Sequence, residues 1–178
     1  MRIVEQNSIT VSLFERIQSA LSEFAPEIVT SDNMWKYQDV FYSNDEYYLL
    51  TDGRSATEDD IKETIDYGKD FDAVSVHSWG FSTNNEAIAF LSILEDYPDP
   101  DMLYIGLFLV DEKNKRKHIG SCIIKVVADC AFEMNYRSIK LSVLQENISG
   151  VKFWESLGFR KVSCANRDGN LSMEYKQG

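Results

Sequence analysis

The sequence predicts a single domain of mixed α and β structure, and three observations lead to that prediction. The chain has 178 residues, a length that suits one domain able to bury a full core. Its composition, with 44% hydrophobic and 12% aromatic residues, argues against disorder. Segments with the period of an amphipathic helix alternate along the chain with short apolar runs typical of strands.

In the N-terminal part, the pattern predicts a short strand at residues 2–7 and an amphipathic helix at 9–24. The apolar residues of this helix are spaced three or four apart: Leu13, Phe14, Ile17, Leu21 and Phe24. The aromatic stretch 34–50 fits neither period and stays unassigned. Thr57, followed by three acidic residues, is typical of an N-cap and first turn, and it predicts a helix that ends near Tyr67.

The middle of the chain is rich in strand signals. Residues 73–81 and 86–94 are β-rich runs on either side of "STNN", which predicts a hairpin. The prolines of "DYPDPD" fix φ and lack an N–H group, so this stretch is a stiff turn. The run 102–110 is almost continuously apolar, which is typical of a central strand covered on both faces.

The clearest helix of the chain follows Gly120, with apolar residues repeating every four positions. A strand at 138–144 and a helix at 147–157 come next. The chain then ends in two strands, 158–164 and 171–177, around the tight turn "NRDGN".

Charge is distributed unevenly between the two parts of the chain. Residues 1–100 contain 6 basic and 20 acidic residues, a net charge of −14, whereas residues 101–178 contain 12 and 9, a net charge of +3. We therefore expect the first part to favour cationic partners. The alternative is that the acidic surface serves solubility alone.

Several classes of site are not expected. The N-terminus lacks the apolar segment of a signal peptide and no apolar run approaches 18 residues, so we expect neither a signal peptide nor a membrane span. Cys122, Cys130 and Cys164 are widely spaced, which predicts reduced thiols in a cytoplasmic protein. His77 and His118 show no metal-ligand spacing, and no metal is expected.

One basic loop stands out in this acidic chain. "DEKNKRKHIG" joins the apolar run ending at Val110 to the helix that begins near Gly120. The start of a helix offers unpaired N–H groups and a partial positive charge, and a glycine lets a bulky anion approach them. We interpret the loop as a diphosphate site; the alternative is an ordinary solvated loop. It contains neither a Walker motif nor GxGxxG.

The sequence from this loop onward resembles the GNAT superfamily of acyl-CoA-dependent N-acetyltransferases. Motif A is carried by "VDEKNKRKHIG", through Val110, Lys115, His118 and Gly120. Motif B is carried by "LSVLQENISGVKFWESLGF", through Leu141, Val143, Asn147, Phe153, Gly158 and Phe159. The resemblance covers residues 75–178, and the first 75 residues match only in the order of their elements.

The resemblance implies the GNAT fold, an α+β domain whose central, mostly antiparallel, twisted sheet has six to seven strands and about four helices over both faces. The whole chain, 1–178, would form this one domain. Residues 1–100 would be the acceptor side, 101–160 the acetyl-CoA-binding core and 160–178 a C-terminal hairpin.

The resemblance also implies a set of cofactor contacts, with acetyl-CoA as co-substrate. Backbone groups near Leu109 and Val110 would pair with the pantetheine arm. The diphosphate would be held by the amides of Lys115, Arg116, Lys117, His118, Ile119, Gly120 and Ser121. Asn147 would reach the pantetheine, and its alternative role is a helix N-cap. The CoA channel would be lined by Phe153 and Trp154, and the alternative role of Trp154 is to fill the core.

Three positions depart from the motifs. His118 replaces the first motif glycine, which costs about 1 kcal/mol if its φ is positive. Trp154 stands where many members have the tyrosine that protonates the leaving thiolate, and Tyr104 where some have a glutamate base. We take Tyr104 as the catalytic candidate, acting as an acid. A nearby carboxylate could accept the ammonium proton through water: Glu95, Asp96 or Asp101.

The implied activity is transfer of an acetyl group from acetyl-CoA to a primary amine, by direct attack in a ternary complex. The charge balance favours a small cationic amine or a protein or peptide amino group. The alternative is a sensor or interaction module that binds acyl-CoA without turnover. Nucleic acid is not expected as a partner, because one short basic loop is a poor electrostatic footprint. A homodimer is left open.

Overall fold

The computed structural model describes residues 11–67 and 75–177. The strand expected at 2–7 lies outside the described residues. So do the first two residues of the helix expected at 9–24 and of the strand expected at 73–81.

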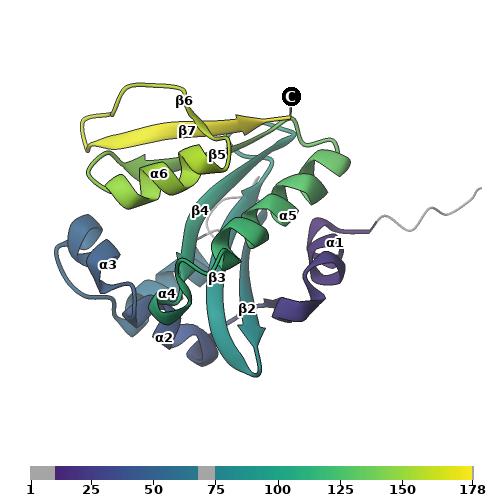
Figure 1. Cartoon of the computed structure of the whole chain (residues 1–178), viewed down its shortest axis with the longest axis vertical. Coiled ribbons are helices and arrows are strands. Elements are labelled where there is room, and N and C mark those ends of the chain that lie inside the picture. The colour runs from purple at the N-terminus through teal and green to yellow at the C-terminus, as the bar shows by residue number, and fades with distance from the viewer. Residues whose placement is uncertain (1–10, 68–74, 178) are drawn as a thin grey trace, which may run out of the picture.

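Seven strands among the described residues form one sheet, in the order β1-β2-β3-β4-β5-β7-β6 (Figure 1). Their bounds are β1 (Glu27–Ile28), β2 (Ser75–Thr83), β3 (Glu86–Glu95), β4 (Met102–Val110), β5 (Ser138–Leu144), β6 (Arg160–Lys161) and β7 (Asn170–Lys176). All neighbouring strands are antiparallel except β4 and β5, which are parallel. This confirms the predicted mostly antiparallel sheet of six to seven strands.

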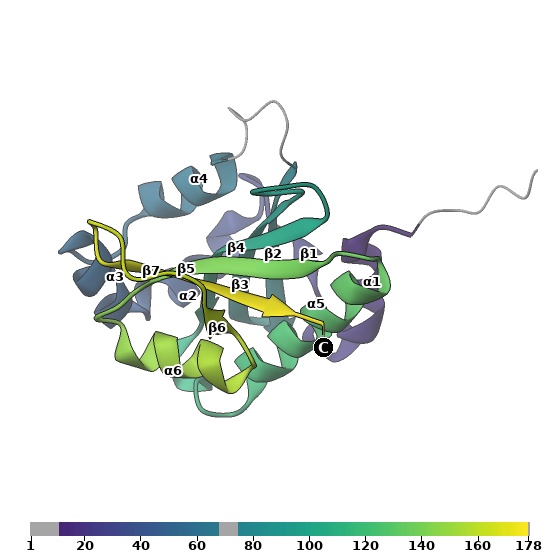
Figure 2. The same cartoon turned by 90° about the horizontal axis from the view of Figure 1, so that it is seen from above.

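Helices cover both faces of this sheet (Figure 2). One face is covered by α1 (Leu13–Ala20), α5 (Ile119–Glu133) and α6 (Ile148–Ser156). The other is covered by α2 (Gln38–Tyr42), α3 (Asp45–Asp52) and α4 (Glu58–Asp66). The described residues thus contain six α-helices rather than about four, because the unassigned aromatic stretch folds as a 3₁₀ turn, η2 (Met34–Tyr37), followed by two short helices.

Two of the remaining predictions need correction. The expected helix at 9–24 is shorter, because α1 ends at Ala20 and a separate 3₁₀ turn, η1 (Ser22–Phe24), follows. The expected strand at 158–164 is reduced to the two residues of β6. The cause is Asn166, whose Oδ1 accepts the N–H groups of Asp168 and Asn170 and so builds a wider turn.

The core consists of two clusters, one on each face of the sheet. β4 contributes Leu103 and Ile105 to the cluster under α1, α5 and α6. It contributes Leu109 to the cluster under α2, α3 and α4. The prediction of a central strand covered on both faces is therefore confirmed for β4.

The parallel strands β4 and β5 pair only over their first residues. Their register runs from Met102 opposite Ser138 to Ile105 opposite Leu141, although both strands continue beyond these pairs. At this point the register between β3 and β4 also skips Gly106, which forms a β-bulge. β4 and β5 then diverge (Figure 1), and β4 has an open edge from Gly106 onward.

Candidate functional site

The open edge of β4 presents backbone groups that can pair with an extended ligand. Asp111 donates its N–H to Ile88 of β3 at 2.9 Å. Because successive strand residues point their backbone groups to opposite edges, Leu109 also faces β3, whereas Phe108 and Val110 face the opening. Of the two backbone positions expected from the sequence, Val110 is thus at the open edge and Leu109 is not.

The basic loop joins β4 to the first turn of α5. Its short 3₁₀ turn, η3 (Glu112–Asn114), is held by Asn114, which donates its N–H to the Asp111 carbonyl at 2.8 Å and its side-chain amide to the Asp111 carboxylate at 3.0 Å. His118 is the N-cap of α5, with φ of 62° and no side-chain cap bond. The φ of His118 is therefore positive, the condition under which a cost of about 1 kcal/mol is expected at this position.

The start of α5 leaves a row of backbone donors available. The first helical hydrogen bond runs from Cys122 N–H to His118 C=O at 2.9 Å. Among the described residues, the six N–H groups from Arg116 to Ser121 have no hydrogen-bond partner. Together with the macrodipole of a 15-residue helix, this row can bind an anion with several oxygens, such as a diphosphate.

The cations of the loop are not equally available. Lys115 forms an ion pair with Glu112 at 2.5 Å and Lys113 forms one with Glu86 at 3.6 Å. The side chains of Arg116 and Lys117 are exposed, and no ion pair is found for them within the described residues. These two side chains therefore supply the accessible positive charge.

Gly120 brings the loop, the open edge and α6 together. A Cβ atom at this position would lie 3.2 Å from Val110 Cγ2 and 3.4 Å from both Phe108 Cε1 and Phe153 Cζ. The rings of Phe108 and Phe153 are stacked, with centroids 6.1 Å apart. Glycine at 120 thus keeps the turn close to β4 and α6.

The two motif B residues with alternative roles, Asn147 and Trp154, show contacts typical of those alternatives. Asn147 Oδ1 accepts the Gly150 N–H at 2.9 Å, so Asn147 caps α6. Trp154 is 8% exposed and packs between Phe153 and Phe159, at centroid distances of 4.9 and 5.2 Å. Trp154 is therefore part of the core, while Phe153 is only half-buried and adjoins Gly120.

Tyr104 lies on the sheet face opposite α5, because its neighbour Leu103 packs under α5. Its ring packs edge-on against Tyr97, with centroids 5.4 Å apart. Burial raises the pKa of the Tyr104 hydroxyl, and a hydrogen bond with the Ser142 side chain offsets part of that rise. A phenol with a raised pKa stays protonated near neutral pH, so Tyr104 can donate a proton but is a poor base.

Of the carboxylates considered as proton acceptors, Glu95 lies apart from Tyr104, while Asp96 and Asp101 belong to the turn between β3 and β4. Glu95 is paired with Leu103, so its side chain is on the other face of the sheet. There it contacts His77 Nε2 at 3.0 Å and accepts the Tyr136 hydroxyl. The hydrogen bond with His77 is the largest effect that lowers the pKa of Glu95. Asp96 accepts the N–H of Asp101 at 3.0 Å within the turn between β3 and β4.

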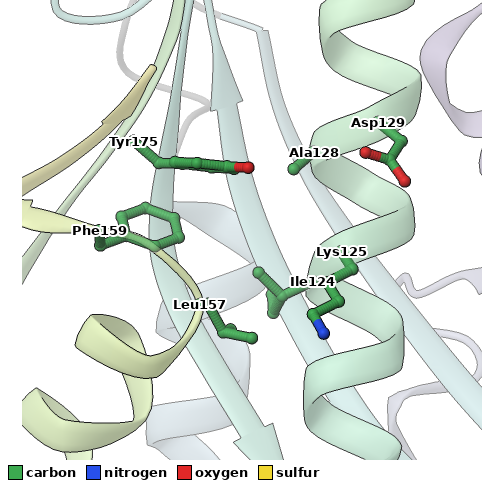
Figure 3. A pocket seen from close by; sticks show the side chains of 7 residues that line it. All are labelled: Ile124, Lys125, Ala128, Asp129, Leu157, Phe159 and Tyr175. Atoms are coloured by element: carbon green, nitrogen blue, oxygen red, sulfur yellow. The ribbon is translucent and has the colours of Figure 1, made fainter. Parts of the chain in front are cut away.

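A separate pocket of about 190 Å³ opens between α5 and the turn after α6 (Figure 3). Its floor is apolar and the Tyr175 hydroxyl points toward α5, where Lys125 and Asp129 line it. The lining residues are Ile124, Lys125, Ala128, Asp129, Leu157, Phe159 and Tyr175. None of the site residues expected from the sequence lines this pocket.

The structure adds one contact that sequence reasoning missed. Asn44, between α2 and α3, donates its side-chain amide to the Val110 carbonyl at 3.0 Å. Next to it, Ser43 Oγ accepts the Glu112 N–H at 3.1 Å. Both residues lie in the stretch 34–50, whose sequence carries no periodic signal, so no local pattern could have revealed them.

A comparison with protein families identifies the family. The profile of the Acetyltransferase (GNAT) family matches residues 34–159, which include the open edge, the basic loop and α6. The chain belongs to this family. The family assignment confirms the resemblance seen in motifs A and B.

Individual relatives in the family are distant. Over 59 residues the chain is 34% identical to N-alpha-acetyltransferase 30 of Dictyostelium discoideum, a match that spans 33% of this chain and 32% of that relative. An acetyltransferase from Thermus thermophilus superposes with a TM-score of 0.72 at 16% identity, covering 85% of this chain and 97% of the other. A Thermoplasma acidophilum N-acetyltransferase, crystallised in complex with coenzyme A, gives 0.60 at 13% identity, covering 85% and 99%.

Within residues 11–67 and 75–177, no group of three or more His, Cys, Asp or Glu side chains is placed to hold a metal ion. In the same ranges, no helix has the length and hydrophobicity needed to cross a membrane. All three cysteines are free thiols, and burial raises the pKa of Cys130.

Proposed function

We propose that this chain is an acyl-CoA-dependent N-acetyltransferase that transfers an acetyl group from acetyl-CoA to a primary amine. The observation that carries the proposal is the row of six partnerless N–H groups from Arg116 to Ser121, directly beside the open edge of β4. The first feature suits a diphosphate and the second an extended arm with amide groups. Coenzyme A contains both.

In this proposal the cofactor follows the path from α5 to β4. The diphosphate sits on the amides from Arg116 to Ser121, with the Arg116 and Lys117 side chains adding positive charge from outside. The Lys115 amide, included in the expected set, already donates to the Glu112 carbonyl at 3.2 Å. The pantetheine arm runs along β4, where the N–H groups of Phe108 and Val110 are directed to the opening. Phe153 lies against the same turn.

The chemistry needs a neutral amine held in line with the thioester. The nitrogen attacks the carbonyl carbon, a C–N bond forms and the C–S bond breaks. A backbone N–H of the open edge polarises the carbonyl oxygen, and Phe108 is the donor closest to the point where β4 and β5 part. The ammonium proton leaves to water, and Tyr104 donates a proton to the leaving thiolate.

The acceptor is proposed to be cationic before it reacts: a small amine or a protein or peptide amino group. The helices that cover the Tyr104 face support this class. Residues 38–66 contain nine acidic and two basic residues, so their field attracts positive charge. We place the reaction in the cytoplasm because of the three unpaired thiols.

A second candidate function is an acyl-CoA sensor without turnover. It is favoured by the burial of Trp154 where family members carry a tyrosine acid, and by the absence of a free carboxylate next to Tyr104 among the contacts of the described residues. In that case Tyr104 would be a packing residue alone.

Two measurements test the proposal. Calorimetry should show binding of acetyl-CoA and CoA, and a thiol-release assay should show turnover on one or more cationic amines. Tyr104→Phe should lower kcat about 10- to 100-fold while the affinity for CoA stays unchanged. Binding without release on any amine would favour the sensor, and no binding of either cofactor would refute both functions.

A further inference from the structure

We propose that Asn44 is a further cofactor-binding residue, whose side-chain oxygen accepts a hydrogen bond from an amide N–H of the pantetheine arm. The inference rests on the proposed function, because it requires coenzyme A at the open edge of β4. If so, a residue between α2 and α3, in the acceptor-side part of the chain, contacts the cofactor.

The orientation of the Asn44 side chain follows from its partners. Asn44 is 4% exposed, and its side-chain nitrogen donates to the Val40 carbonyl at 2.7 Å and to the Val110 carbonyl at 3.0 Å. Both partners are carbonyl oxygens that can only accept. A rotated amide would place oxygen against two oxygens, so the nitrogen must face them and Oδ1 must face away.

The oxygen is left available by this arrangement. Among the described residues, Asn44 Oδ1 has no hydrogen-bond partner. This oxygen is also not fully enclosed by the protein. It is therefore accessible from the surface, on the same carboxamide group that binds the Val110 carbonyl. A buried asparagine with one unsatisfied acceptor is well suited to a ligand donor.

The backbone of β4 shows how an acceptor from Asn44 fits the open edge. A ligand with secondary amides that lies along a strand edge needs both donors and acceptors from that edge. Val110 offers its N–H, but its C=O is already bound by Asn44. The carboxamide of Asn44 uses one of the two lone pairs of that carbonyl and adds its own oxygen as a further acceptor beside it.

The first test separates the pantetheine arm from the nucleotide. Asn44→Leu keeps the volume but removes the oxygen together with the nitrogen that binds the Val40 and Val110 carbonyls. Calorimetry compares CoA with adenosine 3′,5′-bisphosphate, which lacks the arm. We expect the affinity for CoA to fall about 3- to 10-fold while that for the bisphosphate stays within about twofold. Equal losses for both ligands, or no loss for CoA, would overturn the inference.

Ser43→Ala is the matched control. It breaks the neighbouring bond between Ser43 Oγ and the Glu112 N–H, which joins the same two segments without touching the open edge. We expect neither affinity to change. If this variant also lost CoA affinity selectively, the cause would be a change in the connection between α2 and α3. That result would count against a direct contact between Asn44 and the ligand.

A second test uses the unmodified protein and does not depend on the folding of a variant. Each pantetheine amide is replaced in turn by an ester, which deletes one N–H. We expect the wild-type chain to bind one of the two analogues about 3- to 10-fold more weakly than CoA. Asn44→Leu should not discriminate against that analogue. Equal wild-type binding of CoA and both esters would refute the contact, whereas no binding of CoA itself would refute the proposed function.

Discussion

The helices α5 and α6 both begin beside the opening between β4 and β5, yet their first turns are built in opposite ways. α6 is capped by its own sequence, because Asn147 Oδ1 binds the Gly150 N–H. α5 begins at His118, which has a left-handed backbone and no side-chain cap bond. Two further helices, α1 and α4, carry complete capping boxes at Ser12 and Thr57.

This difference shows that the chain leaves free backbone N–H donors at the start of α5 and not at the start of the other three helices. In α1, α4 and α6 a side chain of the N-cap residue accepts a hydrogen bond from an N–H group of the first turn, so these helices need no ligand there. In α5 the donors stay unpaired and the preceding loop is basic rather than acidic. An uncapped start is costly for folding alone, and it becomes useful when an anion completes it.

The largest expected effect comes from filling the open start of α5. Gly120→Leu adds atoms where a Cβ alone would be 3.2 Å from Val110 Cγ2 and 3.4 Å from Phe108 and Phe153, so the first turn of α5 must shift and its amides are displaced. We expect the affinity for CoA to fall by about 100-fold or more, measured by calorimetry. The crowding should also cost about 1–3 kcal/mol of unfolding free energy, so circular dichroism must show a folded variant. Affinity retained within threefold would contradict the account.

The next effect concerns the self-capped helix α4. Asp60 binds the Arg54 guanidinium through two contacts of 2.8 Å and accepts the Thr57 N–H. These bonds hold the pKa of the Asp60 carboxyl below its usual range, and the bond with Arg54 has the largest effect. Asp60→Asn should lower the unfolding free energy at pH 7 by about 2 kcal/mol.

The pH dependence of that loss has a definite sign. A lowered folded-state pKa means that the stabilisation is complete above the unfolded value of about 3.9 and disappears as the pH falls below it. The difference in unfolding free energy between wild type and Asp60→Asn, measured by urea unfolding, should therefore begin to narrow below about pH 4 and keep narrowing as the pH falls toward the lowered folded-state pKa. Asp59→Asn, at a side chain that is 83% exposed, is the control and should change little. A gap that does not narrow at all between pH 5 and pH 2 would show that Asp60 acts through packing instead.

A smaller effect tests how much the charges of the loop contribute. Arg116→Ala and Lys117→Ala should each weaken CoA binding about 3- to 10-fold at low salt, and the loss should shrink as salt is added. Lys115→Ala should do less, because Lys115 is paired with Glu112. Lys161→Ala on β6 serves as the control. Losses as large as that of Gly120→Leu would mean that the side chains, rather than the amides, carry the binding.

The smallest effects are two stability changes of opposite sign. Asn147→Ala removes the cap of α6 and should cost about 1 kcal/mol. His118→Gly relieves the positive φ of 62° and should gain up to about 1 kcal/mol, less the extra chain entropy of glycine. Thermal melts check both. If both substitutions destabilise equally, the start of α5 is not strained and the contrast with α6 weakens.

Much of the fold was predictable because its signals are local. The strands at 102–110 and 138–144 have the predicted bounds, since the first is an almost continuously apolar run and the second alternates polar and apolar residues. The starts of α4 and α6 follow directly after Thr57 and Asn147, as residues that cap helices require. The basic loop before Gly120 was visible from composition and spacing alone.

The rest depends on contacts between distant residues. Asn44 and Val110 are 66 positions apart in the chain, and neither carries a signal that points to the other. The divergence of β4 and β5 depends on a bulge at Gly106, inside a run that reads as an unbroken strand. Glu95 lies on the face away from Tyr104 because of the register between β3 and β4. The sequence of one strand does not determine its register with a neighbouring strand.

The most direct test follows the backbone amides by NMR while CoA is added. The account predicts that the N–H signals of residues 116–121 shift strongly, at the stoichiometry found by calorimetry, while the Gly150 amide inside the α6 cap moves little. Large shifts confined to another part of the chain, with residues 116–121 unchanged, would contradict the claim that the uncapped start of α5 holds the diphosphate.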